Sequence, residues 1–333
     1  MNNLYEYSRL YPQMPLEIIL FFKMEAKDGK VVNKQVYQFC DYYKTKYSTA
    51  DFPQPRIVAA ICDLLVLNNN LSRLNQAGPD THNSYLSIIK DNRLETDEAV
   101  QFQVNKILSY RIYGFKFIYE DYKKYVRPVE FTNKNDNKTL GTCFLYQGGI
   151  ATARHCIDGA KNIAIDGFSP DKLKSARFEI HGNELMDLLF IRFDPPLLDT
   201  IILGQDAEIL DEVMALGFPK IPGYHNFLTA ENATVSSRFT ASVGQIASNA
   251  KDIWIKEKLY LITAKIKGGN SGGPVVAKNG NVIGVAVNLA EGEGDYDELG
   301  YGTVIPISFL NELIASQNKV LLDVDKINFK VFE

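Results

Sequence analysis

The chain has 333 residues, of which 46% are hydrophobic and 23% are charged, and its formal net charge at pH 7 is −4. This composition is typical of a soluble globular protein that is long enough for about two or three domains. The slight excess of acidic residues excludes a general electrostatic attraction to nucleic acids or anionic membranes. No run of about 18 apolar residues is present, which excludes a membrane-spanning helix.

The N-terminus and the cysteines predict a cytoplasmic protein. The first residues, MNNLYEYSRLYPQMPLEI, lack the basic start and apolar core of a secretory signal. Cys40, Cys62, Cys143 and Cys156 show no CxxC spacing, so we expect reduced thiols rather than a disulfide framework. The four histidines are scattered along the chain and predict no zinc cluster.

Apolar residues recur at helical spacing through residues 1–110. The pattern predicts helices over residues 15–27, 33–47, 54–69 and 95–112. In the clearest of them, 54–69, one stripe collects Ile57, Ala60, Ile61, Leu64 and Leu65. Asn33 and Ser48 are expected to be cap or turn residues where the helices break.

The first three of these predicted helices, 15–27, 33–47 and 54–69, could form a winged helix-turn-helix, although any small helical domain would show the same pattern. Residues 1–110 contain twelve Lys and Arg and twelve Asp and Glu, whereas a DNA-binding domain needs an excess of positive charge on one face. We therefore expect residues 1–110 to be a helical adaptor or regulatory domain that docks a protein partner. Binding of nucleic acid is the disfavoured alternative.

From about residue 112 the apolar period changes to two, which predicts strands. The runs cover residues 113–121, 125–131, 141–147, 149–155, 162–168, 176–182, 188–194, 212–218, 233–240, 259–266, 273–279, 281–288 and 300–307. Gly148-Gly149 and Asn279-Gly280 mark hairpins, the latter typical of a tight two-residue turn. Many short strands without helices between them predict a sandwich or barrels. The segment 194–200, which contains two prolines, could connect two such units, and a helix is expected from Ser308.

One serine, Ser271, lies between two pairs of glycines in KGGNSGGPVV, residues 267–276. A nucleophilic serine needs a base within hydrogen-bonding reach, an acid to orient that base, and backbone N–H groups for the oxyanion. Glycines on both sides allow the backbone to turn its amides inwards and a substrate to approach. His155 ends one predicted strand and Asp187 begins another, in a chain order known for serine triads.

These segments resemble the trypsin-like (chymotrypsin-fold) serine peptidases, and among them the Deg/HtrA-like bacterial branch. The matching stretches are GTCFLYQGGIATARHC, DLLFIRF, EVMALGFP, GGNSGGPVV, NGNVIGVAV and GYGTVIPI, within roughly residues 125–317. The resemblance implies two six-stranded β-barrels over residues 111–317 with the active site between them. Residues 318–333 would form a C-terminal tail, and the protein would be a serine endopeptidase acting on proteins or peptides.

The resemblance also implies the role of each residue. Ser271 would attack the scissile carbonyl, His155 would transfer the proton, and Asp187 would orient the imidazole. The N–H groups of Gly269 and Ser271 would form the oxyanion hole. The strand that pairs with substrate and lines the specificity pocket would contain Ala286, Val287 and Asn288. No metal or organic cofactor is implied.

The residues leave alternatives open. Asp194 or Asp166 could replace Asp187, and Cys156 could suggest a thiol nucleophile, although the nucleophile position holds serine. The protein could instead be a catalytically latent peptidase-fold scaffold, or a DNA-binding regulator with a protease half.

Three features of the sequence bear on activation and specificity. Asn270 stands where secreted trypsins have an aspartate, so activation by N-terminal cleavage is not expected. The acidic segment 291–298 would favour basic residues near the cleaved bond if it lined the cleft. Lys265 would act in the opposite direction if its strand register pointed it into the pocket.

Overall fold

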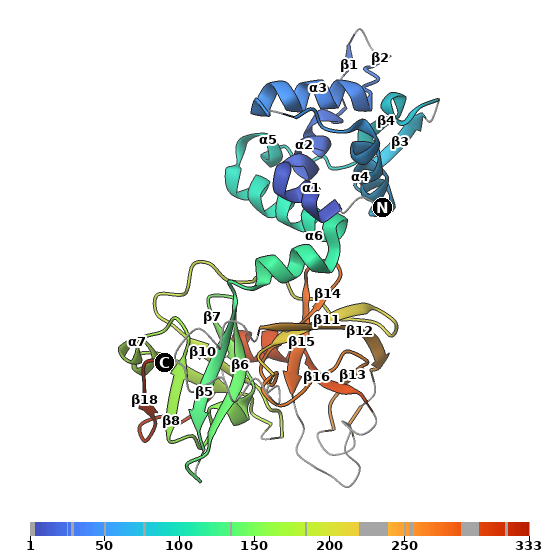
Figure 1. Ribbon diagram of the computed structural model, residues 1–333. Coiled ribbons are helices and arrows are strands. Elements are labelled where there is room, and N and C mark those ends of the chain that lie inside the picture. The colour runs from blue at the N-terminus through green and yellow to red at the C-terminus, as the bar shows by residue number, and fades with distance from the viewer. Residues whose placement is uncertain are drawn as a thin grey trace. The chain divides into compact units, whose positions relative to one another are not determined.

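The computed structural model describes residues 4–24, 26–27, 30–49, 51–75, 78–133, 135–183, 185–219, 239–249, 251–252, 256–287, 300–316 and 319–332 (Figure 1). The chain forms two compact units, Met1–Ile118 and Tyr119–Glu333. The boundary expected after residue 110 lies within helix α6 (Glu98–Tyr122), and the structure divides the chain later in the same helix. Among the described residues, no helix is both long and apolar enough to cross a membrane.

The first unit consists of short helices and two small hairpins. Its elements are α1 (Leu4–Leu10), α2 (Met14–Phe21), β1 (Ala26–Lys27), β2 (Lys30–Val31), α3 (Val36–Tyr47), α4 (Pro55–Leu67), β3 (Leu71–Asn75), η1 (Asp80–His82), β4 (Ser84–Ser87), α5 (Arg93–Thr96) and the start of α6. Gln35, directly before α3, forms a β-bridge with Ser84. In chain order, α3 and α4 therefore lie between the bridging residue Gln35 and the hairpin of β3 and β4.

Asn33 and Ser48 were expected at the ends of a helix, and only Ser48 is a cap residue of α3. Ser48 is the C-cap residue and adopts a left-handed conformation with φ 48°. The N-cap residue is Gln35 rather than Asn33, because Gln35 and Gln38 form a reciprocal capping box.

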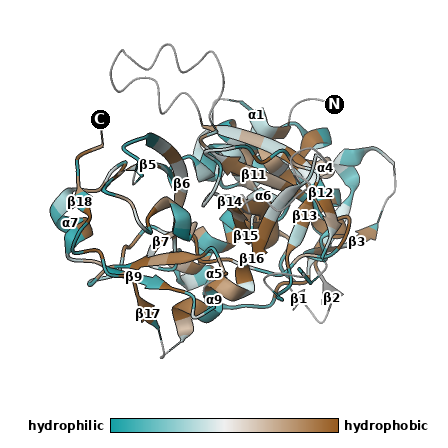
Figure 2. Ribbon diagram, turned by 90° about the horizontal axis from the view of Figure 1, so that it is seen from below, coloured by the Kyte–Doolittle hydropathy of each residue, from teal (hydrophilic) through white to brown (hydrophobic). Residues whose placement is uncertain are grey.

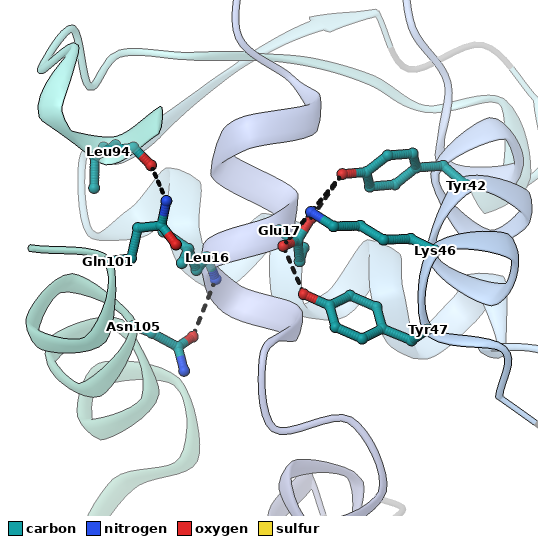
Figure 3. Close-up of polar contacts among 8 residues, drawn as sticks. All are labelled: Leu16, Glu17, Tyr42, Lys46, Tyr47, Leu94, Gln101 and Asn105. Carbon is teal, nitrogen blue, oxygen red and sulfur yellow. Dashed lines mark hydrogen bonds and ion pairs between the residues drawn. The ribbon is translucent and has the colours of Figure 1, made fainter. Parts of the chain in front are cut away.

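A buried carboxylate joins α2 to α3. Glu17 interrupts the apolar run of α2 and is only 3% exposed. Its oxygens accept hydrogen bonds from the hydroxyls of Tyr42 (2.8 Å) and Tyr47 (2.7 Å) and from the Lys46 ammonium group (2.8 and 2.9 Å), all on α3 (Figure 3). Burying a charge is costly unless the charge is paired and hydrogen-bonded. These three donors therefore make Glu17 a polar link in the core.

The segment 113–121 was expected to be a strand, but the structure shows it to be helical. It forms the second part of α6, which is interrupted at Gly114, where φ is 67°. Aromatic residues on alternate positions of this segment produced the apolar period of two that predicted a strand. In the structure, the fully buried side chains of Ile118 and Tyr122 are four residues apart and therefore lie on one face of the helix. Tertiary packing has overridden the local pattern.

The second unit begins with an eight-stranded sheet in the order β17-β9-β10-β7-β6-β5-β8-β18. Its strands are β5 (Val126–Thr132), β6 (Lys138–Tyr146), β7 (Gly149–Thr152), β8 (Asn162–Ile165), β9 (Arg177–Ile180), β10 (Leu189–Arg192), β17 (Val320–Leu321) and β18 (Asn328–Phe329). Between the strands lie η2 (Arg154–Cys156) and α7 (Pro170–Lys174). The six strands expected here, β5 to β10, are all present.

The remaining strands form a closed barrel in the order β11-β12-β13-β16-β15-β14. They are β11 (Glu212–Gly217), β12 (Thr240–Ser248), β13 (Tyr260–Ile262), β14 (Pro274–Ala277), β15 (Val282–Val287) and β16 (Gly302–Pro306), and α9 (Ile307–Ala315) follows. Figure 2 colours β15 and β16 largely as hydrophobic, as their complete burial requires. The mainly-β fold and this six-stranded barrel confirm the predicted class. The expected strand 233–240 shares only its last residue with β12, and residues 233–238 lie outside the described part.

Both expected hairpins are present, but the first turn lies one residue earlier than expected and the second is one residue longer. Gln147 and Gly148 form the first turn, with φ of 42° and 81°, and Gly149 already belongs to β7. In the second, the Ala277 N–H donates to Asn281 O (2.9 Å), which leaves residues 278–280 as a three-residue loop with positive φ at Gly280.

The first sheet does not close into the six-stranded barrel that was expected. Instead, two strands of the C-terminal tail pair with its outer strands. β17 pairs antiparallel with β9. β18 pairs parallel with β8, beside which it lies in Figure 1. The edges that a six-stranded barrel would join to each other are therefore covered by the two ends of one segment, residues 319–332. An uncovered edge would leave unpaired backbone N–H and C=O groups.

The ring of Phe329 anchors this tail, and its loss should weaken the second unit. Phe329 is 5% exposed, and its ring centroid lies 5.6 Å from that of Phe178 on β9. We expect Phe329→Ala to lower the free energy of unfolding by about 3 kcal/mol, because it leaves a cavity. Urea denaturation would measure the change, with Val331→Ala (67% exposed) as the matched control, for which we expect less than about 0.5 kcal/mol. Equal small effects of the two substitutions would contradict an anchoring role.

Candidate active site

Asp187 and His155 are held together by strand register. In the pairing of β10 with β7, Leu189 lies opposite Thr152, and extending this register by two residues brings Asp187 opposite Arg154. One carboxylate oxygen, Oδ2, accepts a hydrogen bond from His155 Nδ1 (2.6 Å), and Oδ1 accepts one from the His155 backbone N–H (2.9 Å). Asp187 therefore fixes both the ring and the backbone of His155.

The environment of His155 raises its pKa. Partial burial of the ring lowers the pKa, but the hydrogen bond from Nδ1 to the Asp187 carboxylate, which stabilises the imidazolium, and the neighbouring Cys156 side chain raise it and together outweigh burial. The bond also leaves the other ring nitrogen, Nε2, as the one that can exchange protons with a substrate or nucleophile. The His155 side chain is 43% exposed, whereas that of Asp187 is only 16% exposed, so solvent reaches the imidazole more readily than the carboxylate.

Ser271 lies in the connection between β13 and β14, and its backbone carbonyl is bound to the part of the first sheet that carries His155. The carbonyl accepts a hydrogen bond from the Thr142 N–H (2.9 Å) and a weak one from the Cys156 thiol (3.7 Å). Because Cys156 follows His155 directly, these contacts bring the Ser271 segment next to the histidine. Ser271 is 4% exposed, and its hydroxyl makes no hydrogen bond to any described residue, His155 included.

The residues before Ser271 form a turn that leaves two amides free. The Asn270 N–H donates to Lys267 O (2.8 Å), and Gly269, at the third position, has φ 102°. This combination defines a type II β-turn, which requires a positive φ that glycine adopts without strain. Within the described part of the chain, neither the Gly269 N–H nor the Ser271 N–H has a hydrogen-bond acceptor. Two unpaired donors beside a serine hydroxyl are suited to stabilise an oxyanion.

The glycine after the serine is required by close packing. Gly272 has φ 86°, and a Cβ at this position would lie 2.1 Å from Thr142 O and 2.3 Å from Thr152 Oγ1. The Gly272 N–H donates to Ala286 O (2.7 Å). Any side chain here would push the Ser271 segment away from the first sheet.

The residues expected to bind substrate are less completely placed. The Ala286 N–H donates to Gly273 O (2.8 Å), so this N–H holds the serine segment and is not free for a peptide. Val287 is buried at the end of β15, and its role in substrate binding stays a prediction. Asn288 and the acidic segment 291–298 lie outside the described residues.

The structure also answers the question of register at Lys265. Ala264 and Ile266 are buried, whereas Lys265 is exposed. Ile266 packs against Gly302 of β16, where an added Cβ would lie 2.7 Å from its side chain. Lys265 is therefore an exposed residue, and the neighbouring side chain of Ile266 packs in the barrel core.

Contacts distinguish the aspartates that the sequence left open. Asp187, and neither Asp166 nor Asp194, accepts the hydrogen bond from His155 Nδ1. Burial raises the pKa of the neighbouring Cys143 thiol, and all four cysteines are buried free thiols. Over the described residues, no group of three or more His, Cys, Asp or Glu side chains could hold a metal ion.

The sequence contained no signal for one residue that contacts this site. Thr142 on β6 donates its hydroxyl hydrogen to Gly269 O (2.7 Å), in addition to the backbone bond to Ser271 O. A single threonine in a strand carries no pattern of its own, and only the approach of β6 to the serine segment reveals the contact.

Comparisons with known proteins identify the type of domain that contains these residues. Residues 141–285 match the family model of the trypsin-like peptidase domain, a range that contains His155, Asp187 and Ser271. The magnetosome formation protease MamE of Magnetospirillum gryphiswaldense is 27% identical over 178 residues, which are 51% of this chain and 21% of that protein. The periplasmic serine endoprotease DegP of Escherichia coli is 27% identical over 172 residues, 51% of this chain and 33% of DegP.

Among solved structures, the active form of the Rv3671c protease of M. tuberculosis is similar, with a TM-score of 0.46 and 18% identity over 63% of this chain and 88% of that one. The chain spans only about a fifth to a third of the length of MamE and DegP.

Replacing Asp187 by asparagine should lower the pKa of His155. The carboxylate stabilises the imidazolium, so the folded wild type should keep its ring protonated to a higher pH than the Asp187→Asn variant does. NMR titration of the His155 ring signals, assigned with a His155→Gln variant, would measure both values.

The matched control is Asp166→Asn, which changes the same side chain at the other aspartate near the first sheet. We expect the His155 pKa to be unchanged in this variant. An equal fall in both variants would show that general charge, rather than the 2.6 Å contact, determines the titration.

Proposed function

We propose that this chain, which carries a trypsin-like peptidase domain over residues 141–285, is a serine endopeptidase that uses Ser271, His155 and Asp187. The family acts on protein or peptide substrates. The observation that carries the proposal is the hydrogen bond between Asp187 and His155 (2.6 Å) beside a serine turn whose Gly269 and Ser271 amides have no acceptor among the described residues.

The reaction follows from the positions of these groups. The Ser271 hydroxyl attacks the scissile carbonyl carbon while His155 Nε2 takes its proton, and the carbonyl becomes an oxyanion that the N–H groups of Gly269 and Ser271 stabilise. Asp187 stabilises the imidazolium through Nδ1. The imidazolium then protonates the leaving amine, which leaves an acyl group on Ser271. Water, deprotonated by His155, hydrolyses this ester and restores the serine.

The main rival is a catalytically latent protein with a peptidase fold. It is favoured by one observation, since the Ser271 hydroxyl makes no hydrogen bond to His155. In many free enzymes such contacts are long and tighten only when substrate binds. Reactivity of the serine therefore discriminates between the two functions.

The first unit is proposed to dock a protein partner that regulates the peptidase. Its surface exposes large apolar side chains, among them Leu10 (63%), Leu67 (78%) and Phe102 (59%). Helix α4 carries only two charged residues, Arg56 and Asp63, and the Asp63 carboxylate is already paired with Arg73. A helix with so few free cations is poorly suited to phosphate contacts, which favours a protein over DNA.

A cytoplasmic location is proposed on the state of the cysteines. All four are buried free thiols, which suits a reducing compartment. The name of the relative DegP places that protein in the periplasm. Fractionation of cells expressing the full chain would decide between the two compartments.

Labelling with a fluorophosphonate tests whether Ser271 is an activated nucleophile. We expect the wild type to be labelled and Ser271→Ala to be unreactive, because the probe phosphonylates only an activated hydroxyl, whose oxygen displaces fluoride from phosphorus. Ser72→Ala, which removes an exposed serine of β3, is the control and should be labelled like the wild type. A folded wild type that remains unlabelled would favour the latent scaffold.

The rate of labelling should rise with pH as His155 loses its proton, because only the neutral ring can act as a base. Since the pKa of His155 is raised, we expect the midpoint above the ordinary histidine value of about 6.5. Asp187→Asn should lower the plateau rate on the order of 10⁴-fold, because the ring then loses its orientation and tautomer. A pH-independent rate in the wild type would contradict general-base catalysis by His155.

A further inference from the structure

The Thr142 hydroxyl connects three separate parts of the second unit. It donates to Gly269 O (2.7 Å) and accepts a hydrogen bond from the Phe218 N–H (3.0 Å), which follows β11. Thr142 itself belongs to β6 of the first sheet and is 0% exposed. One hydroxyl therefore ties the first sheet and the closed barrel to the turn that precedes Ser271.

The bond to Gly269 O controls the orientation of a particular peptide group. The peptide between Gly269 and Asn270 has its oxygen held by Thr142 and its N–H held by Lys267 O (2.8 Å). Both ends of this peptide are held, and its neighbour across the Gly269 Cα, where φ is 102°, is the peptide group that carries the Gly269 N–H. Glycine has wide conformational freedom, so without the Thr142 bond the turn could relax and rotate this amide away.

The surroundings leave the hydroxyl little room to move. A Cβ added to Gly217 would lie 2.9 Å from Thr142 Oγ1, and one added to Gly273 would lie 3.1 Å from the Thr142 methyl group. Phe218, the donor, is fixed by its ring, whose centroid is 5.5 Å from that of Phe239, and Phe239 stacks on Tyr119 of α6 at 5.1 Å. The hydroxyl is thus held by packing as well as by its two bonds.

We propose that Thr142 is a positioning residue whose hydroxyl holds the Gly269 turn in the form that presents the Gly269 and Ser271 amides to the oxyanion. The expected effect on catalysis rests on the proposed peptidase function. The effect of the Thr142 hydroxyl on the conformation of the Gly269 turn does not depend on that function. Thr142 touches neither the substrate nor the Ser271 hydroxyl, so its effect on catalysis is indirect. It acts on transition-state stabilisation and leaves the His155–Asp187 pair intact.

Thr142→Val removes the hydroxyl while nearly preserving the shape of the side chain, and Thr142→Ser retains the hydroxyl. We expect Thr142→Val to reduce the plateau rate of fluorophosphonate labelling on the order of 10- to 100-fold, since the loss of one oxyanion donor costs about 10²–10³. The midpoint of the pH profile should stay where it is in the wild type. Thr142→Ser should restore most of the rate.

Thr200→Val is the matched control, because the Thr200 hydroxyl also accepts a hydrogen bond from a backbone amide, that of Gly148 (3.0 Å), away from the serine turn. It should leave the labelling rate unchanged. An equal loss in Thr142→Val and Thr200→Val, or no rescue by Thr142→Ser, would overturn the proposal.

A second measurement is independent of catalysis. Hydrogen–deuterium exchange of the full-length protein should show faster exchange over residues 268–273 in Thr142→Val than in the wild type, Thr142→Ser or Thr200→Val. If the wild type is not labelled, the peptidase proposal fails, and the exchange comparison still decides the role of Thr142. Unchanged exchange in a folded Thr142→Val variant would refute it.

Discussion

The attachment of the Ser271 segment to strands β6 and β7 is the contact on which the candidate site depends. The carbonyl of Ser271 is bound by Thr142, Gly272 fits against Thr142 and Thr152 with no space for a side chain, and the Cys156 thiol reaches the same carbonyl. The serine belongs to the closed barrel, whereas the histidine and aspartate belong to the eight-stranded sheet. Their proximity is therefore a consequence of how two sheets pack, and the glycines allow that packing.

The two halves of the candidate site are stabilised in different ways. Asp187 and His155 are placed by the register of β10 and β7 and joined by a charge-assisted hydrogen bond, which is among the stronger kinds in proteins. The serine turn is placed by ordinary neutral hydrogen bonds and by the conformational freedom of Gly269. A site built in this manner keeps its acid–base pair as a rigid element, while its oxyanion donors depend on the contacts of one short turn.

The tail and helix α6 show how segments outside the matched domain contribute to the second unit. Residues 319–332 cover both edges of the eight-stranded sheet that carries His155 and Asp187. The last turns of α6 contribute Tyr122, whose hydroxyl donates to Gly280 O (2.7 Å), and Tyr119, which stacks on Phe239. Residues 119–122 and 319–332, which lie outside the matched range, are therefore part of the second folded unit.

Sequence alone determined the components of this protein. Periodicity identified most strands and the main helices, because alternation and the 3.6-residue repeat reflect which face of each element is buried. The glycine-framed Ser271, with His155 and Asp187 in order, indicated the chemistry, because those residue types at those places have few other uses. Tertiary structure decided the rest. It made 113–121 helical through the packing of Ile118 and Tyr122, chose Asp187 over Asp166 and Asp194, turned Lys265 to solvent, and brought Thr142 to Gly269 O. Each of these depends on contacts between residues far apart in the chain, and such contacts leave no local pattern to read.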